Sequence, residues 1–255
     1  MRLNYQNNLD IWANKNLNTK ERQAPEQSYV NNVFSNITGH YDQMNTIMTL
    51  GMHHLWKSKL IKIVSKNNPQ LCIDIATGTG DISRKLSMVP SVKQVLSTDI
   101  LPDMLKLAIT KSKSSKTNHK HSYFASTAIN LPIKSNIADV VTAGFSLRNM
   151  PDLEQAISEM ARVTKSGGIV STLELTPYKT RIIGKLIGLY FNSIVPIIGT
   201  LISNNREAYS YLPKSVDNFI DAEQLKTLFE KCGLQKVKYT KLGMGTIAIH
   251  TGYKP

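Results

Sequence analysis

Cysteine is scarce in this sequence, and spacings typical of metal sites are missing. The 255 residues include two cysteines, Cys72 and Cys232, which stand alone without a CxxC or HxxxH pattern. The cysteine count therefore gives no disulfide framework, favours a reducing compartment and supplies no argument for a metal. Cys72 lies in an apolar run, so we expect it to be a small core residue.

Apolar runs long enough to span a membrane are also lacking. The longest, residues 182–202, contains Lys185, Asn192 and Ser193, and Pro196 breaks it. A membrane-spanning helix of about 20 residues has few or no charges, so we reject a transmembrane helix here. Two alternatives are left: a pair of lid helices that contact an apolar substrate, or an ordinary buried helical pair.

Acidic residues are outnumbered by basic ones, and the formal net charge is +13. Solubility and a coding bias towards Lys and Asn are two simple explanations, whereas a nucleic acid or an anionic membrane surface is a more specific one. The lysines are scattered, so charge alone does not decide. No apolar signal core is present at the N-terminus, and we expect residues 1–28 to be a polar, disordered tail.

The rest of the chain is organised around a glycine turn between Leu71 and Asp81. The sequence Leu-Cys-Ile-Asp-Ile-Ala-Thr-Gly-Thr-Gly-Asp begins as an apolar strand, turns at Gly78 and Gly80, and continues into a helical pattern. This order brings a ligand against backbone at the carboxyl end of a parallel sheet. Glycine adopts backbone angles closed to other residues and has no Cβ to hold a ligand away.

Carboxylates around this turn indicate which ligand it binds. A dinucleotide turn has a third glycine where this chain has Ser83, and its pyrophosphate would be repelled by Asp74 and Asp81. A sulfonium cation with an amino group would be attracted by them. Asp99 ends the next apolar strand and can bond both hydroxyls of a ribose. The residues therefore predict an S-adenosylmethionine pocket, with a turn that merely needs small residues as the alternative.

The periodicity predicts an α/β fold with one domain over residues 29–255. Helical spacing over 29–66 predicts a helical cap, and residues 180–215 form an inserted lid. Strands and helices then alternate, which implies a parallel, doubly wound, Rossmann-like sheet of seven strands. Predicted strands follow the first at 92–98, 122–126, 138–145, 169–175, 237–241 and 246–252, with a turn at Gly167 and Gly168. The last two form an antiparallel hairpin, as in the class I methyltransferases.

Several short segments, in the right order, resemble the ubiquinone/menaquinone biosynthesis C-methyltransferase family over nearly nine-tenths of the chain. They are Val33-Phe34, Tyr41-Asp42-Gln43-Met44-Asn45, Gly51-Met52-His53-His54-Leu55-Trp56-Lys57, the glycine turn, Phe145-Ser146-Leu147-Arg148-Asn149, Leu173-Glu174-Leu175, Tyr209-Ser210-Tyr211-Leu212 with Ser215, and Ile247-Ala248-Ile249-His250-Thr251-Gly252. Many methyltransferases share the glycine turn, whereas the segments around Met44, Trp56 and Arg148 are far more specific.

This resemblance implies a cofactor and a substrate. Members of the family use S-adenosylmethionine to methylate a ring carbon of a polyprenylated benzoquinol or naphthoquinol. Together with the turn, the resemblance gives an expected cofactor site of Asp74, Gly78, Thr79, Gly80, Asp81, Asp99, Ile100, Thr127, Ala128 and Gly144. The chain departs from the family at Thr127, where Asp or Asn is usual, at Gly144 for serine, at Ser146 for glycine and at His54 for arginine.

Ring methylation needs an electron-rich quinol, produced by loss of a hydroxyl proton. Arg148 follows the fourth predicted strand, and its forked, permanent charge can hold a phenolate oxygen or order a water that relays the proton. We assign Asn149 to the same oxygen, and Tyr41, Tyr209 and Tyr211 to ring walls or proton partners. The alternative for Arg148 is an ion pair with an acid such as Asp152 that pins the loop.

Three histidines could act as a general base. His53, His54 and His250 are the candidates, and a structural role is favoured for each of them.

A sterol or polyketide methyltransferase is an alternative function. An RNA methyltransferase is less favoured because the Asn/Asp-Pro-Pro-aromatic motif is absent, so we expect no nucleic acid partner. We expect peripheral membrane contact, at the cytoplasmic face in a bacterium or the matrix side in a mitochondrion. A homodimer or a quinone-biosynthesis complex also agrees with the resemblance.

Overall fold

The computed structural model describes residues 25–177 and 206–255, with side chains of the second segment from Tyr211 on. Most of the predicted tail, most of the predicted lid and the apolar run at 182–202 lie outside the described residues. Among the described residues, no helix combines the length and the apolar character needed to cross a membrane.

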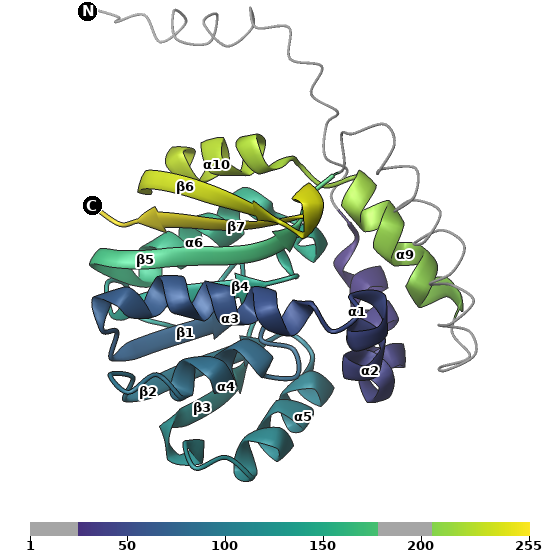
Figure 1. Cartoon of the computed structure of the whole chain (residues 1–255), viewed down its shortest axis with the longest axis horizontal. Coiled ribbons are helices and arrows are strands. Elements are labelled where there is room, and N and C mark those ends of the chain that lie inside the picture. The colour runs from purple at the N-terminus through teal and green to yellow at the C-terminus, as the bar shows by residue number, and fades with distance from the viewer. Residues whose placement is uncertain (1–24, 178–205) are drawn as a thin grey trace, which may run out of the picture.

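A single seven-stranded sheet forms the centre of the molecule (Figure 1). Its order is β3-β2-β1-β4-β5-β7-β6, and all neighbours are parallel except β5–β7 and β7–β6. The predicted mostly parallel sheet with an antiparallel C-terminal hairpin is therefore confirmed. The strands are β1 (Leu71–Ile75), β2 (Gln94–Asp99), β3 (His121–Ala125), β4 (Ala138–Gly144), β5 (Thr164–Leu175), β6 (Gln235–Leu242) and β7 (Ile247–Tyr253).

Helices cover both faces of the sheet and one of its ends. The described helices are α1 (Gln27–Ile37), α2 (Tyr41–Met48), α3 (His53–Val64), α4 (Asp81–Ser87), α5 (Pro102–Lys113), α6 (Leu153–Val163), α9 (Arg206–Asp217) and α10 (Ala222–Lys231). Figure 1 shows α1, α2 and α9 gathered beyond the carboxyl ends of the parallel strands. The predicted helical cap over 29–66 corresponds to α1, α2 and α3, although α1 begins two residues before the predicted start.

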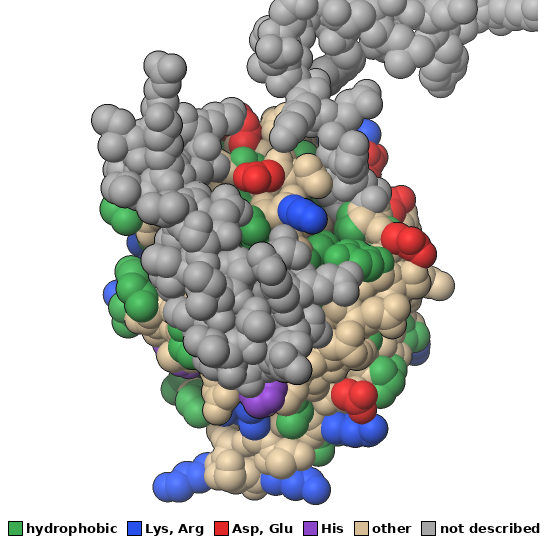
Figure 2. All heavy atoms as spheres, turned by 90° about the vertical axis from the view of Figure 1, so that its right-hand side faces the viewer, with side chains coloured by type: hydrophobic (Ala, Val, Ile, Leu, Met, Phe, Trp, Pro, Cys, Tyr) green, Lys and Arg blue, Asp and Glu red, His purple; other side chains and the backbone are tan. Residues whose placement is uncertain are grey.

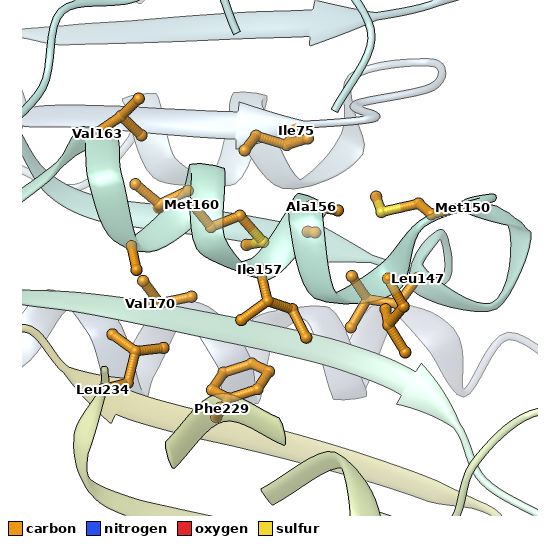
Figure 3. Close-up of a cluster of buried hydrophobic side chains, with 14 of the residues drawn as sticks. Ile75, Leu147, Met150, Ala156, Ile157, Met160, Val163, Val170, Phe229 and Leu234 are labelled. Atoms are coloured by element: carbon orange, nitrogen blue, oxygen red, sulfur yellow. The ribbon is translucent and has the colours of Figure 1, made fainter. Parts of the chain in front are cut away.

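Side chains of the central strands point alternately to the two faces of the sheet, where they belong to two separate hydrophobic cores. In β1, Ile73 and Ile75 point to the core under α6 and α10, whereas Cys72 belongs to the core under α3 and α4. Figure 3 shows Ile157 of α6 pointing toward Phe229 of α10, and Met160 of α6 belongs to the same core. Burial of both faces explains why these strands are nearly continuous apolar runs. Cys72 is fully buried, as predicted, and burial raises the pKa of its thiol to about 12.

The predicted turn at Gly167 and Gly168 is wrong, because both glycines lie inside β5. Gly167 has a φ of +74°, and the pairing register with β4 shifts between Ala138 and Val140. A Cβ on Gly168 would lie 3.0 Å from the carbonyl oxygen of Ala138. The glycines therefore allow a bulge that keeps the strand continuous, where the sequence pattern suggested an interruption.

Candidate active site

The glycine turn between β1 and α4 has the strained backbone expected of it. Gly78 and Gly80 have φ values of +55° and +81°, and Ala76 is also left-handed at +50°. A Cβ on Gly80 would lie 3.0 Å from the Cβ of Ala108, so this glycine lets α4 and α5 approach each other. At Gly78 the nearest atom to such a Cβ is Tyr41 Cε1, at 3.9 Å. Gly78 therefore faces the cap, whereas Gly80 serves packing.

Two cavities meet at this turn. The cap cavity lies between α1–α3, the turn and α9, and the edge cavity lies at the ends of β2, β3 and β4. Their walls share the residues Phe34, Tyr41, Ala76, Gly78, Gly144 and Phe145. Because these six residues line both, the two cavities adjoin each other; we call the pair the elongated site and the shared residues its waist. Figure 2 shows the end of the molecule that carries this site.

Asp99 stands in the wall of the edge cavity. Its Oδ2 accepts from the Gly78 amide at 2.8 Å, and its Oδ1 accepts from the Leu101 amide at 2.9 Å. Burial raises the pKa of this carboxyl, and the backbone donors oppose that rise. A carboxylate offers about four acceptor positions, so the two amides leave room for the hydroxyls of a ribose. Ile100, Thr127 and Ala128 line the same cavity.

Asp74 lies in the cap cavity at the end of β1. The hydroxyls of Thr142 and Thr77 donate to its two oxygens, at 2.7 and 2.5 Å. Burial raises the pKa of Asp74 to about 6, even though these hydrogen bonds favour the ionised form. The side chain is held rigidly by its own strand, its neighbour β4 and the turn.

Asp81 is more strongly neutralised than the sequence suggested. Its Oδ2 accepts from Lys57 Nζ at 2.7 Å, and Arg84 contacts its other oxygen. Burial would raise the pKa of Asp81, but the ammonium of Lys57 and the guanidinium of Arg84 hold it below its ordinary value. The expectation of an acidic surrounding for a cationic methyl donor therefore needs correction, because Asp81 is one anion between two cations.

The cap is joined to the turn by a second charged contact. Thr79 Oγ1 donates to Asp42 Oδ1 at 2.7 Å, and Lys111 of α5 pairs with the other oxygen of Asp42. Thr79 is 3 % exposed and lines the cap cavity. The predicted cofactor residue Thr79 thus also anchors α2 over the turn.

Arg148 lies in the short 3-10 turn Leu147–Asn149 that follows β4, and it is 8 % exposed. Its Nη1 donates to Glu174 Oε1 at 2.6 Å and to the Phe145 carbonyl at 2.7 Å. Its Nε donates to Ser215 Oγ of α9 at 3.3 Å. The third nitrogen, Nη2, makes no hydrogen bond to any residue that the structure describes, and Arg148 lines the cap cavity.

The proposed alternative partner of Arg148 is wrong. Asp152 caps the N-terminus of α6, where its side chain accepts from the Gln155 amide at 2.8 Å. The acid that pairs with Arg148 is Glu174, at the end of β5, and it is 1 % exposed. The guanidinium is therefore pinned by an ion pair, while its Nη2 keeps its donor hydrogens free of any partner among the described residues.

Three of the remaining predicted catalytic residues, Asn149, Tyr41 and Tyr211, line the two cavities. Tyr211 donates its hydroxyl to Asn149 Oδ1 at 2.9 Å, so the amide group of Asn149 keeps its donor hydrogens for another partner. Tyr211 lines the cap cavity and Asn149 the edge cavity, while Tyr41 lines both. Burial raises the pKa of Tyr41, so the phenol stays protonated. The side chain of Tyr209 lies outside the described residues.

The candidate histidine bases have other surroundings. His250 is 1 % exposed in β7, lies 2.8 Å through Nε2 from the Ala222 carbonyl, and lines neither cavity. His53 lines the cap cavity, where burial and then Lys57 lower its pKa to about 4. These positions agree with a structural role for His250 and keep the imidazole of His53 neutral.

His53, His54 and Asp81 are the one group of three possible metal ligands among the residues that the structure describes. His53 Nδ1 already lies 2.8 Å from Thr49 Oγ1, and the cations of Lys57 and Arg84 already neutralise Asp81. Cations beside a carboxylate weaken its attraction for a metal ion. We therefore assign no metal to this group.

Nine of the ten predicted cofactor residues line one or both cavities. Eight of them are Asp74, Gly78, Thr79, Asp81, Asp99, Ile100, Thr127 and Ala128. Gly144 also lines both, but a Cβ there would lie 2.2 Å from Ile82 Cδ1. Ile82 thus fills the space that a serine side chain would need. Gly80 lines neither cavity.

Four polar residues of the site were not predicted: Asp42, Lys57, Glu174 and Ser215. All four stand in the segments that carry the family resemblance, which was the available signal. Composition and periodicity give no sign of their pairing, because each contact joins elements far apart in the sequence.

The chain matches the model of the ubiE/COQ5 methyltransferase family over residues 21–254. It is 34 % identical over 244 residues to the ubiquinone/menaquinone biosynthesis C-methyltransferase UbiE of Rickettsia bellii, covering 94 % of this chain and 98 % of that protein. Identity to the protein of the same name from Shewanella frigidimarina is 34 % over 226 residues, covering 88 % and 90 % of the two chains.

Solved structures with lower identity share the fold. The [4+2]-cyclase SpnF superimposes with a TM-score of 0.69 at 15 % identity, covering 92 % of this chain and 99 % of that one. The phosphoethanolamine N-methyltransferase 2 of Haemonchus contortus, solved with S-adenosyl-L-methionine, gives a TM-score of 0.58 at 14 % identity, covering 78 % and 52 %. The fold is that of class I S-adenosylmethionine-dependent methyltransferases, and the chain belongs to the ubiE/COQ5 methyltransferase family.

Proposed function

We propose that this protein transfers a methyl group from S-adenosylmethionine to a ring carbon of a polyprenylated quinol in ubiquinone or menaquinone biosynthesis. The observation that carries the proposal is the elongated site, in which Asp99 lines one cavity and Arg148 the other, with Gly78 at the waist between them. The names of the bacterial relatives agree with this substrate class.

The residues present suit S-adenosylmethionine. The carboxylate of Asp99 has free acceptor positions for the ribose, and Ile100, Met104 and Ile129 give the edge cavity apolar walls for a purine. At the waist Gly78 has no side chain, so a ligand can pass from the edge cavity to the cap cavity. When bound, the cofactor supplies an electrophilic methyl group.

The cap cavity suits an apolar ring. Val33, Ile37, Met44, Met48 and Trp56 line it, so apolar surface of a substrate would be removed from water there. Arg148 Nη2 is available to the oxygen of a quinol, and the permanent charge of the guanidinium favours the phenolate over the phenol. The phenolate is the electron-rich form. Its neighbouring ring carbon would take the methyl group as the bond from that group to sulfur breaks, and the same carbon would then lose its proton to restore the aromatic ring.

A labelled methyl-transfer assay with alternative acceptors tests the proposal. Purified protein with methyl-labelled S-adenosylmethionine is offered a demethyl prenylated benzoquinol, a demethyl prenylated naphthoquinol, a sterol and RNA. We expect label in a ring carbon of one or both quinols, identified by mass spectrometry. Label in the sterol or the RNA instead would support the competing functions and contradict this one.

We also propose that the protein contacts a membrane surface through an apolar rim near the cap cavity. The rim consists of Leu50, Met52, Leu55 and Met244, which are 82 %, 43 %, 67 % and 74 % exposed. The first three flank residues that line the cap cavity, and the turn before Met244 approaches Trp56, since a Cβ on Gly243 would lie 3.1 Å from its ring. A prenylated substrate is stored in the bilayer, and the net charge of +13 favours anionic lipid.

The membrane proposal applies to the cytoplasmic face in a bacterium or the matrix face in a mitochondrion, and sedimentation with vesicles tests it. We expect the protein to pellet with phosphatidylglycerol-containing vesicles at low salt. The double variant Leu50→Ser/Leu55→Ser should bind about tenfold more weakly, because two large apolar side chains no longer enter the lipid. Met88→Ser, which changes an exposed methionine in the turn after α4, is the matched control. Equal binding of all three proteins, or no binding at low salt, would contradict the proposal.

A further inference from the structure

Lys57 is a buried cation in the cap cavity to which no reaction step has been assigned. It projects from α3, its side chain is 9 % exposed, and its Nζ lies 2.7 Å from Asp81 Oδ2. An ammonium has three donor hydrogens, and Asp81 is the one hydrogen-bond acceptor of Lys57 Nζ among the described residues. Two donors therefore remain in a place where buried polar groups ordinarily find partners.

Asp81 is the single carboxylate that Lys57 and Arg84 both contact. Asp74 is the other buried carboxyl near Lys57, but its two oxygens accept from Thr142 and Thr77, and no hydrogen bond joins it to Lys57 among the described residues. Asp42 of the cap is already paired with Lys111. A ligand that placed an anionic group beside Lys57 would give its two remaining donors an acceptor in a site that is mostly shielded from water.

The shape of the elongated site indicates which anion can reach Lys57. A ligand with its ribose on Asp99 extends through the waist at Gly78 and enters the cap cavity where Asp81 and Lys57 lie. In S-adenosylmethionine, the group at that far end is an α-amino acid, with one ammonium and one carboxylate. Asp81 and Lys57 offer the complementary pair of charges, an anion and a cation 2.7 Å apart.

We propose that Lys57 binds the carboxylate of the amino-acid end of the cofactor, while Asp81 accepts from its ammonium. This inference rests on the proposed function, because it presupposes that the elongated site holds S-adenosylmethionine. Lys57 is then a residue that selects the complete cofactor over adenosine compounds without a carboxylate. It also couples α3 of the cap to the presence of cofactor, since the same side chain contacts both.

Binding of two ligands to two proteins tests the inference without an activity assay. The ligands are S-adenosylhomocysteine and its decarboxylated analogue, which differ in the carboxylate alone. By calorimetry, we expect the wild-type protein to bind S-adenosylhomocysteine about 10- to 100-fold more tightly, the range for hydrogen bonds to charged groups. Lys57→Met should weaken the binding of S-adenosylhomocysteine by a similar factor and change the affinity for the analogue by no more than about twofold.

The controls separate this inference from the proposed function. Lys59→Met removes an exposed lysine from the same helix and should bind both ligands like the wild type, and Lys57→Arg should restore part of the discrimination. If the wild-type protein binds neither ligand, the proposed function fails. If it binds both equally, or if Lys57→Met discriminates as well as the wild type, the role of Lys57 is wrong although the function stands. The wild-type comparison decides even if Lys57→Met does not fold.

Discussion

Arg148→Lys is expected to lower quinol methylation by about 10²- to 10⁴-fold, the loss typical for one positioned proton-transfer group. Lysine keeps the positive charge and can still pair with Glu174, so the fold should be retained. It has no planar fork, however, and cannot hold Glu174, the Phe145 carbonyl and a substrate oxygen with separate nitrogens. Single-turnover rates with a demethyl prenylated quinol measure the effect.

Cofactor binding provides the control for this prediction. The affinity of Arg148→Lys for S-adenosylhomocysteine should stay within about twofold of the wild type, because Arg148 is assigned to the quinol oxygen. Unimpaired methylation would remove Arg148 from the mechanism. A loss of cofactor affinity as large as the loss of rate would instead assign Arg148 to the cofactor.

Glu174→Gln is expected to cause the largest loss of stability. The Arg148–Glu174 pair has side chains 6 % and 1 % exposed, and removal of the carboxylate leaves the guanidinium buried without its counter-ion. Breaking such a pair costs about 3–5 kcal/mol. For a chain of this size, the corresponding fall in melting temperature is roughly 6–20 °C, which thermal unfolding followed by circular dichroism can measure.

Two further variants show whether the unpaired charge is the cause. Glu154→Gln removes the partner of the exposed Lys231 and should change the melting temperature little, because solvent screens exposed pairs. Arg148→Met combined with Glu174→Gln removes both charges, and glutamine keeps an oxygen for the Leu175 amide. This double variant should recover most of the stability and remain inactive. If it is as unstable as Glu174→Gln, the buried charge does not explain the loss.

The sheet could be predicted because its strands are marked in the sequence itself. The core strands β1 and β4 are buried on both faces and are flanked by turn residues, so apolar runs of the right length identify them. Asp99 could be predicted for a related reason, since a polar residue that ends an apolar strand lies at the carboxyl end of the parallel sheet, where ligands bind. The twelve-residue β5 was not predicted in full, because Gly167 and Gly168 resemble a turn while they form a bulge.

The pairing of the charged residues could not be predicted. Glu174 reaches Arg148 because β4 and β5 are parallel with Gly144 opposite Leu173, and a change in that register would separate the two side chains. Lys57 reaches Asp81 because α3 packs against α4. Neither the strand register nor the packing of two helices can be derived from the periodicity of one sequence. This is why the surroundings of Asp81 were predicted as acidic when they also contain two cations.

A crystal structure with S-adenosylhomocysteine bound tests the elongated site most directly. We predict that the ribose hydroxyls lie on the carboxylate of Asp99, that the chain passes Gly78, and that the amino-acid end lies beside Asp81 and Lys57. The sulfur should then face the part of the cap cavity that Arg148 lines. Density for the ligand outside these two cavities, or its absence at saturating concentration, would contradict the site and the methyl transfer proposed for it.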